Sequence, residues 1–125
     1  MRRRARFLFV YGTLMRGFHG APGWHREARA RYAGRGRVTG RLYDMGAYPA
    51  AVFAASSGDY VHGELYELRN PAALERLDQY ESAVFLRRLV EVLPEEGPPV
   101  TAWAYSLNRP APAFRLIPGG DYRLA

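Results

Sequence analysis

The sequence has no cysteine among its 125 residues. Disulfide bonds, thiolate metal sites and cysteine nucleophiles are therefore excluded. The absence fits a reducing compartment, and we expect a cytoplasmic protein. A chain of this length buries about two thirds of its unfolded surface without covalent cross-links. We therefore expect residues 1–125 to fold as a single domain.

Long hydrophobic runs are also missing. The apolar run from Phe7 to Val10 is far shorter than the about 20 residues of a transmembrane helix, and shorter than the apolar core of a signal peptide. Hydrophobic residues make up 48% of the chain, which is the usual fraction in soluble globular proteins. We therefore expect a soluble protein with no membrane partner and no visible targeting sequence.

Lysine is absent, so all 18 basic residues are arginines, and with 12 acidic residues they give a formal net charge of +6. A positive charge favours polyanionic partners, which makes a basic module for RNA an alternative function. The arginines are nevertheless dispersed along the whole chain, and their one tight cluster lies within residues 2–6. A compositional bias toward arginine explains the charge equally well, so we do not expect a nucleic-acid partner.

Several familiar catalytic motifs are absent. The sequence has no glycine-rich phosphate loop, no nucleophile-elbow serine and no cluster of metal-ligating residues. The histidines at positions 19, 25 and 62 lack the spacing of metal ligands, and we interpret them as loop or strand residues. No metal site and no cofactor are expected, which leaves carboxylates, tyrosines and backbone groups as candidates for chemistry.

The apolar pattern predicts mainly strands. A continuous apolar run at residues 7–11 ends at Gly12 and predicts a buried central strand. Further strands are predicted at residues 38–44, 60–68, 86–93 and 100–107, and a short helix at 25–32. The firmest helix spans residues 71–81, with Asn70 as a side-chain N-cap and Pro71 in the first helical position. Many strands with one firm helix predict an α+β fold with a strongly curved or closed sheet.

Glu81 stands out among the acidic residues. Leu74, Leu77 and Glu81 lie at i, i+3 and i+7 of the predicted helix and share its apolar face. Burial and the negative end of the helix macrodipole would both raise the pKa of Glu81, so that it could accept and return a proton at neutral pH. Helix geometry alone leaves a second interpretation, in which Glu81 marks a frayed helix end that points into solvent.

The remaining acidic residues are weaker candidates for catalysis. Glu75 and Asp78 flank the inward face of the predicted helix, and we expect both to be solvated. Glu64 lies on the predicted strand 60–68, and we interpret it as a structural residue that pairs with an arginine.

A second candidate element is the segment Tyr11-Gly12-Thr13-Leu14, where the first predicted strand ends. Consecutive backbone N–H groups without a sheet partner can bind a carboxylate or a developing oxyanion, and Gly12 permits close approach. By itself this segment is also compatible with an ordinary strand end.

Several short segments follow one another in a fixed order: FVYGTL at 9–14, GRLYD at 40–44, YPA at 48–50, VHGELY at 61–66, LDQYE at 77–81, AWAY at 102–105 and IPGGD at 117–121. In this order the chain resembles the γ-glutamylcyclotransferase-like family, in particular its γ-glutamylamine cyclotransferase branch. The resemblance implies a compact mixed β-barrel with flanking short helices. It also implies that Tyr11, Gly12, Thr13 and Leu14 bind the γ-glutamyl group and that Glu81 is the catalytic acid/base.

The implied reaction is intramolecular. The α-amine of a small γ-glutamyl substrate attacks its own γ-carbonyl, which yields 5-oxoproline and a released amine, without a metal or cofactor. Two residues depart from the family pattern: Ser82 stands where glycine is frequent, and Phe85 stands where tyrosine is usual, although Arg87 is retained, as expected for an ion pair. Phe85 is either a lost substrate contact or a core ring. A family-fold protein that acts on another small acyl compound, or only binds one, is therefore a further alternative.

Overall fold

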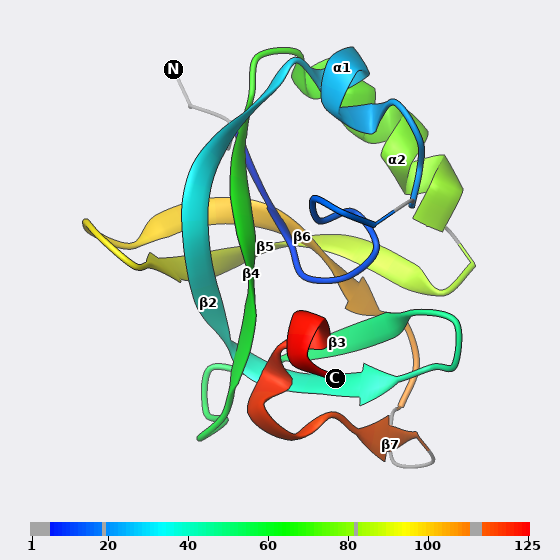
Figure 1. The fold of residues 1–125 in the computed structure, drawn as a ribbon, viewed down its shortest axis with the longest axis vertical. Coiled ribbons are helices and arrows are strands. Elements are labelled where there is room, and N and C mark those ends of the chain that lie inside the picture. The colour runs from blue at the N-terminus through cyan, green and yellow to red at the C-terminus, as the bar shows by residue number, and fades with distance from the viewer. Residues whose placement is uncertain (1–5, 19, 82, 111–113) are drawn as a thin grey trace.

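The computed structural model describes residues 6–18, 20–81, 83–110 and 114–125. The elements follow in the order β1 (Phe7–Val10), α1 (Trp24–Ala28), β2 (Ala30–Asp44), β3 (Pro49–Phe53), β4 (Tyr60–Leu68), η1 (Pro71–Ala73), α2 (Leu74–Glu81), β5 (Phe85–Pro94), β6 (Val100–Leu107), β7 (Arg115–Leu116), η2 (Pro118–Gly120) and η3 (Tyr122–Leu124) (Figure 1). The sequence features noted at residues 2–4, His19 and Ser82 lie outside the described residues.

Five strands close into a barrel. They are hydrogen-bonded in the order β2, β4, β1, β6, β5, and β5 pairs again with β2 at Gly36 and Arg37. The barrel is mixed because β1 runs antiparallel to β4 but parallel to β6. Beyond Gly40, β2 leaves the barrel and pairs with β3 and then with β7. The predicted mixed barrel with short flanking helices is confirmed, and Figure 1 shows both helices on one side of it.

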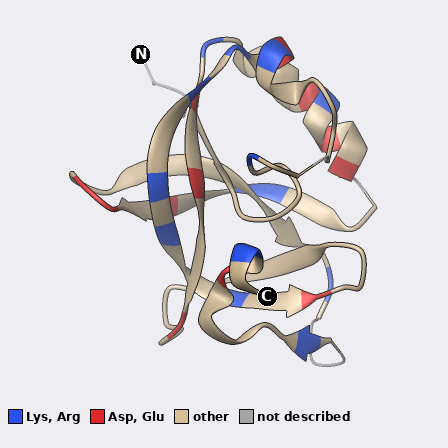
Figure 2. Ribbon diagram, in the orientation of Figure 1, with Lys and Arg blue, Asp and Glu red and all other residues tan. Residues whose placement is uncertain are grey.

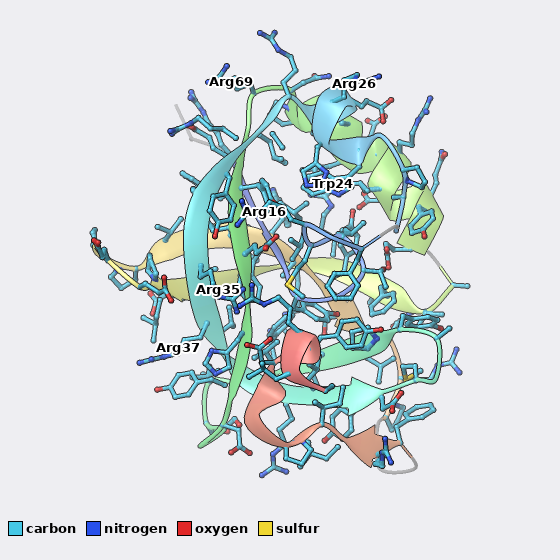
Figure 3. The ribbon with its side chains drawn as sticks, in the orientation of Figure 1. Arg16, Trp24, Arg26, Arg35, Arg37 and Arg69 are labelled. Carbon is cyan, nitrogen blue, oxygen red and sulfur yellow. The ribbon has the colours of Figure 1, made fainter. Side chains whose placement is uncertain are left out.

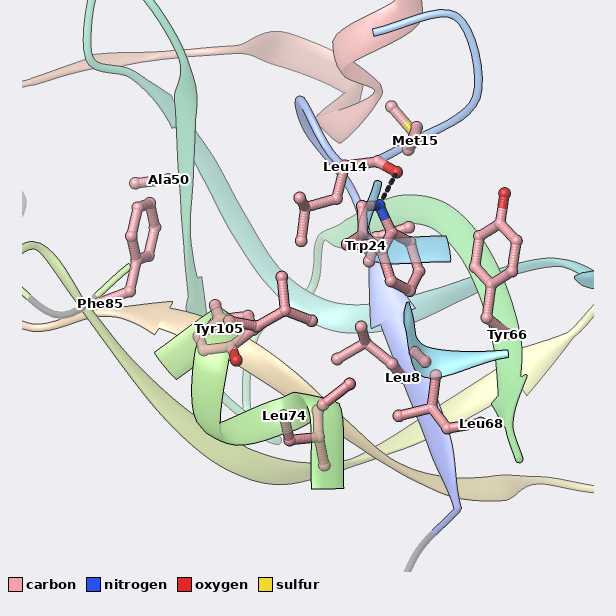
Figure 4. Close-up of a cluster of buried hydrophobic side chains, with 14 of the residues drawn as sticks. Leu8, Leu14, Met15, Trp24, Ala50, Tyr66, Leu68, Leu74, Phe85 and Tyr105 are labelled. Carbon is pink, nitrogen blue, oxygen red and sulfur yellow. Dashed lines mark hydrogen bonds between the residues drawn. The ribbon is translucent and has the colours of Figure 1, made fainter. Parts of the chain in front are cut away.

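β1 is buried on both of its faces. Leu8 and Val10 belong to a hydrophobic cluster that also includes Leu14, Trp24 and the inner face of α2 (Figure 4). The alternate residue Phe9 belongs to a second cluster inside the barrel. This explains why the strand has a continuous apolar sequence instead of an alternating one, as predicted.

The helix predicted at residues 25–32 is wrong in its second half. α1 ends at Ala28 because Arg29 adopts the left-handed conformation, with φ of 50°, and its N–H turns back to carbonyls of the last turn. From Ala30 the chain is extended and pairs with the end of β4. β2 therefore begins before the strand predicted at 38–44, and a bulge between Tyr32 and Arg35 interrupts its pairing.

The helix predicted at residues 71–81 is confirmed as the 3₁₀ turn η1 followed by α2. Leu74 and Leu77 are buried, so its apolar face does point inward. The predicted side-chain cap is wrong, because the Asn70 Nδ2 group donates to the carbonyl of Glu27 at 3.0 Å and so connects this segment to α1. In the described part of the chain no helix is long and apolar enough to cross a membrane.

Candidate active site

A cavity of about 520 Å³ lies between the loop after β1, the turn between β2 and β3, the end of α2 and the strands β5 and β6. Its volume is within the roughly 300–1,000 Å³ range of small-molecule sites. The cavity is lined by residues 9–14, Gly20, residues 47–49, Tyr80, Glu81, residues 83–85 and Tyr105. The segment at residues 11–14 and the distant Glu81, both predicted as site residues, are thus brought together at one cavity.

The loop after β1 has a defined backbone conformation. The Met15 N–H donates to the Gly12 carbonyl at 3.0 Å, and the Gly20 N–H donates to the Thr13 carbonyl at 2.9 Å. The N–H groups of Gly12, Thr13 and Leu14 have no hydrogen-bond partner among the described residues. Within this part of the structure these N–H groups can donate to an anionic ligand.

Two side chains, Trp24 and Glu64, hold the loop in place by hydrogen bonds to its backbone. The Trp24 indole Nε1 donates to the Leu14 carbonyl at 3.2 Å (Figure 4). The Glu64 carboxylate, only 1% exposed, accepts the Arg16 N–H and the Tyr66 hydroxyl, each at 3.0 Å. Arg16, which is labelled in Figure 3, also has its Nε 3.6 Å from Glu64 Oε2. The prediction that Glu64 is structural and paired with an arginine is confirmed, and a buried carboxylate holds the loop in place.

Tyr11 lines the cavity, but its hydroxyl is engaged by the fold. The Tyr11 hydroxyl donates to the Tyr105 carbonyl at 2.6 Å and accepts from the Ala51 N–H at 3.2 Å. Burial raises the pKa of the phenol, and the hydrogen bond from Ala51 offsets this effect only in part. Tyr11 therefore joins β1 to β6 and β3, and its hydroxyl is not poised for proton transfer.

Glu81 is the last residue of α2 and is partly buried where that helix meets the cavity. Burial raises the pKa of its carboxyl group from 4.5 to about 7. At neutral pH the protonated and ionised forms are therefore both populated. Of the two interpretations left open by helix geometry, the frayed end in bulk solvent does not fit this position.

Asp78 keeps part of the solvent exposure that was predicted, with its side chain 38% exposed. It also anchors the end of α2 to two strands. Arg87 on β5 donates to both Asp78 oxygens, from Nε at 2.7 Å and Nη2 at 3.0 Å, and the Tyr105 hydroxyl on β6 donates at 2.7 Å. Burial acts to raise the pKa of Asp78, but these hydrogen bonds outweigh it and leave the pKa below its usual value. The ion pair expected for Arg87 is confirmed, and it lies one helical turn before Glu81.

Comparison with known proteins assigns the chain to a family. Residues 8–124 match the family described as "Gamma-glutamyl cyclotransferase, AIG2-like". The chain belongs to this family. The "Gamma-glutamylcyclotransferase family protein YtfP" of Escherichia coli (strain K12) is 32% identical over 118 residues, which cover 92% of this chain and 94% of that protein.

Solved structures with the same fold include an AIG2-like protein from Mus musculus, with a TM-score of 0.80 and 27% identity. That match covers 96% of this chain and 89% of the mouse chain. YkqA from Bacillus subtilis matches with a TM-score of 0.76 and 28% identity over 97% of this chain. Only 40% of YkqA is covered, so this AIG2-like chain spans less than half of that protein.

Some lining residues of this AIG2-like protein were not predicted as site residues. They come from the turn before β3 and from the segment after α2, and neither segment carries a motif of catalytic type. Phe85, which stands in place of the family tyrosine, is buried and also lines the cavity, with its ring centroid 6.0 Å from that of Tyr48. Gly12 lies close to this turn, since a Cβ there would be only 2.8 Å from Pro49 Cγ.

About half of the arginines in the described residues are paired with acidic side chains. Figure 2 shows arginines spread over many elements. Ion pairs with acidic side chains are formed by Arg16, Arg31, Arg35, Arg41, Arg76, Arg87, Arg115 and Arg123. Arginines that are dispersed and in part paired give no support to the alternative of a basic RNA-binding module. Within the described ranges, no three His, Asp or Glu side chains are arranged to hold a metal ion.

Proposed function

We propose that this AIG2-like protein cyclises γ-glutamyl amides to 5-oxoproline and a free amine, with Glu81 as the catalytic acid/base. The observation that carries the proposal is the partly buried Glu81, with a pKa of about 7, in the same cavity as the N–H groups of residues 12–14. Membership of the family supports the reaction type, and the cavity supports a small-molecule substrate.

In the proposed mechanism the ionised Glu81 accepts a proton from the substrate's α-ammonium group. The freed amine attacks the γ-carbonyl carbon, which forms the C–N bond of the ring. The bond to the departing nitrogen then breaks as Glu81 returns a proton to that nitrogen. The α-nitrogen loses its second proton when the ring closes, and the released amine gains that proton to become an ammonium, so Glu81 ends in its starting state. Acid–base assistance of this kind contributes about 10²–10⁴ in rate.

The loop after β1 has two proposed roles. Its free N–H groups at Gly12, Thr13 and Leu14 bind the γ-glutamyl group and stabilise the oxyanion that develops on the γ-carbonyl. The loop also holds the substrate in a bent conformation, which brings the α-amine to the γ-carbonyl and removes much of the entropic barrier of ring closure. The anchors at Trp24 and Glu64 support this role by fixing the loop before substrate binds.

The test is formation of 5-oxoproline from a panel of γ-glutamyl amides by the purified protein. Glu81→Gln should abolish turnover and still permit binding of 5-oxoproline. Glu75→Gln is the matched control, because Glu75 is exposed on the first turn of the same helix and does not line the cavity. Full activity of Glu81→Gln would refute the mechanism. Binding of 5-oxoproline by an inactive wild type would instead favour a family-fold protein that only binds such compounds.

A further inference from the structure

Part of the cavity wall is formed by apolar and aromatic side chains. This part of the wall determines which amine the substrate can carry. Between the loop after β1 and the end of α2 the wall is formed by Pro49, Tyr48, Phe85 and Val84. Within this wall the Tyr48 and Phe85 ring centroids are 6.0 Å apart, and Val84 is held next to Glu81, because its N–H donates to the Glu81 carbonyl at 3.2 Å. A group that departs from beside Glu81 therefore faces apolar side chains.

Tyr80 adds an aromatic ring that the fold leaves uncovered. It precedes Glu81 on α2 and lines the cavity, yet it is 56% exposed. A large ring that is both exposed and in the wall of a cavity has surface left for a ligand, and aromatic pairs gain stabilisation beyond the area they bury. Tyr80 can thus contact a ligand without any rearrangement of the core.

The same wall offers little to a charged amine component. Of the described residues that line the cavity, Glu81 is the one acidic or basic side chain. Arg87 lies nearby on β5, but its guanidinium is engaged by Asp78 and packs over the Trp103 ring at 4.2 Å. A departing amino acid would bring a carboxylate into this wall and desolvate it without an arginine partner among these residues.

From this wall, and resting on the proposed function, we infer that the released amine is apolar and aromatic, and that Tyr80 determines this specificity by packing against it. An aryl-alkyl amine such as benzylamine represents the chemical class. Methylamine is a suitable reference, because it is also an alkyl amine but lacks the ring. A preference between the two amides therefore reports on contact with the wall more than on leaving-group chemistry.

The kinetic test compares γ-glutamyl benzylamide with γ-glutamyl methylamide. Wild type should prefer the benzylamide in kcat/KM. Tyr80→Ala should lose roughly three- to tenfold for the benzylamide, mainly through KM, and change little for the methylamide. Leu86→Ala is the control, because Leu86 is similarly exposed (58%) but does not line the cavity. An equal loss on both amides, or a wild-type preference for γ-glutamyl amino acids, would overturn the inference while leaving the proposed function intact.

A binding test keeps the inference separate from catalysis. N-benzylglutaramate has no α-amine and cannot cyclise, so its affinity can be measured by calorimetry whether or not the protein turns over any substrate. It should bind more tightly than N-methylglutaramate, and Tyr80→Ala should remove that difference. Equal affinities of wild type for the two compounds would show that the wall does not select an aromatic group. Absence of turnover with a retained benzyl preference would refute the proposed function, and of the inference only the selection of an aromatic group by Tyr80 would stand.

Discussion

Replacing Glu81 by glutamine should stabilise the protein at neutral and alkaline pH. In the unfolded chain the pKa of this side chain is about 4.5, and burial raises it to about 7 in the folded state. A raised pKa stabilises the fold fully below pH 4.5, and this contribution is lost as the pH rises through 7. Glutamine does not ionise. The advantage of Glu81→Gln should therefore be small at pH 4.5, grow up to pH 7 and stay constant above it.

The size of the effect follows from the two pKa values. Their difference at 1.36 kcal/mol per pKa unit gives an upper bound of about 3 kcal/mol for Glu81. Because the side chain is only partly buried, solvent screening reduces this bound, and we expect about 1–2 kcal/mol. For a chain of this size that corresponds to an increase in Tm of about 4–8 °C. Glu81→Gln should thus gain stability and lose turnover, which is the trade-off expected when a residue kept for function destabilises the fold.

The measurement is thermal unfolding of wild type, Glu81→Gln and Glu75→Gln, followed by circular dichroism from pH 4.5 to 9. Glu75 is exposed, so its substitution should leave Tm close to wild type at every pH. A Tm difference between Glu81→Gln and wild type that does not vary with pH would contradict a raised pKa of Glu81. A Glu81→Gln protein less stable than wild type at pH 8 would show that burial does not disfavour the ionised carboxylate.

Three further predictions concern the same cavity. The kcat/KM of wild type should fall as the pH drops below about 7, because Glu81 must be ionised to accept the first proton, and a pH–rate profile checks this. Glu64→Ala should lower the free energy of unfolding by about 2–4 kcal/mol in urea titrations, because the Arg16 N–H loses its buried acceptor. Glu64→Gln, which keeps an acceptor oxygen, should retain most of this stability but raise KM. Glu67→Gln, at a more exposed ion pair, should change neither the stability nor KM. Asp78→Asn should reduce kcat about tenfold with little change in KM. A tenfold loss is expected when one hydrogen bond to a charged group is weakened, and this bond positions the end of α2 with Glu81 but not the loop that binds the substrate.

The sequence predicted those features that depend on local periodicity. α2 was placed by its apolar spacing and by Pro71, and the same spacing put Glu81 on the inward face. β1 was recognised because a strand buried on both faces has no polar alternation. Only the family resemblance predicted that residues 11–14 and Glu81 belong to one site. The sequence around each segment contains no information about the distance between them in the fold.

The features that were missed depend on pairing between distant segments. The first half of β2 is extended because it pairs with β4, although residues 25–32 by themselves favour a helix. Asp78 is anchored because Arg87 and Tyr105 lie directly opposite each other on β5 and β6, so both reach the same carboxylate. That register is set by the closed barrel, and the sequence of α2 contains no sign of it.

The position of β1 between β4 and β6 also determines when during synthesis the cavity can form. β1 is made before its neighbours β4 and β6, which lie far along the chain from it, and such distant pairings form slowly. The cavity needs Tyr105, which belongs to β6 and accepts the Tyr11 hydroxyl at its carbonyl. A nascent chain that has reached only Val100 would therefore contain the loop and Glu81 but no binding site for a substrate.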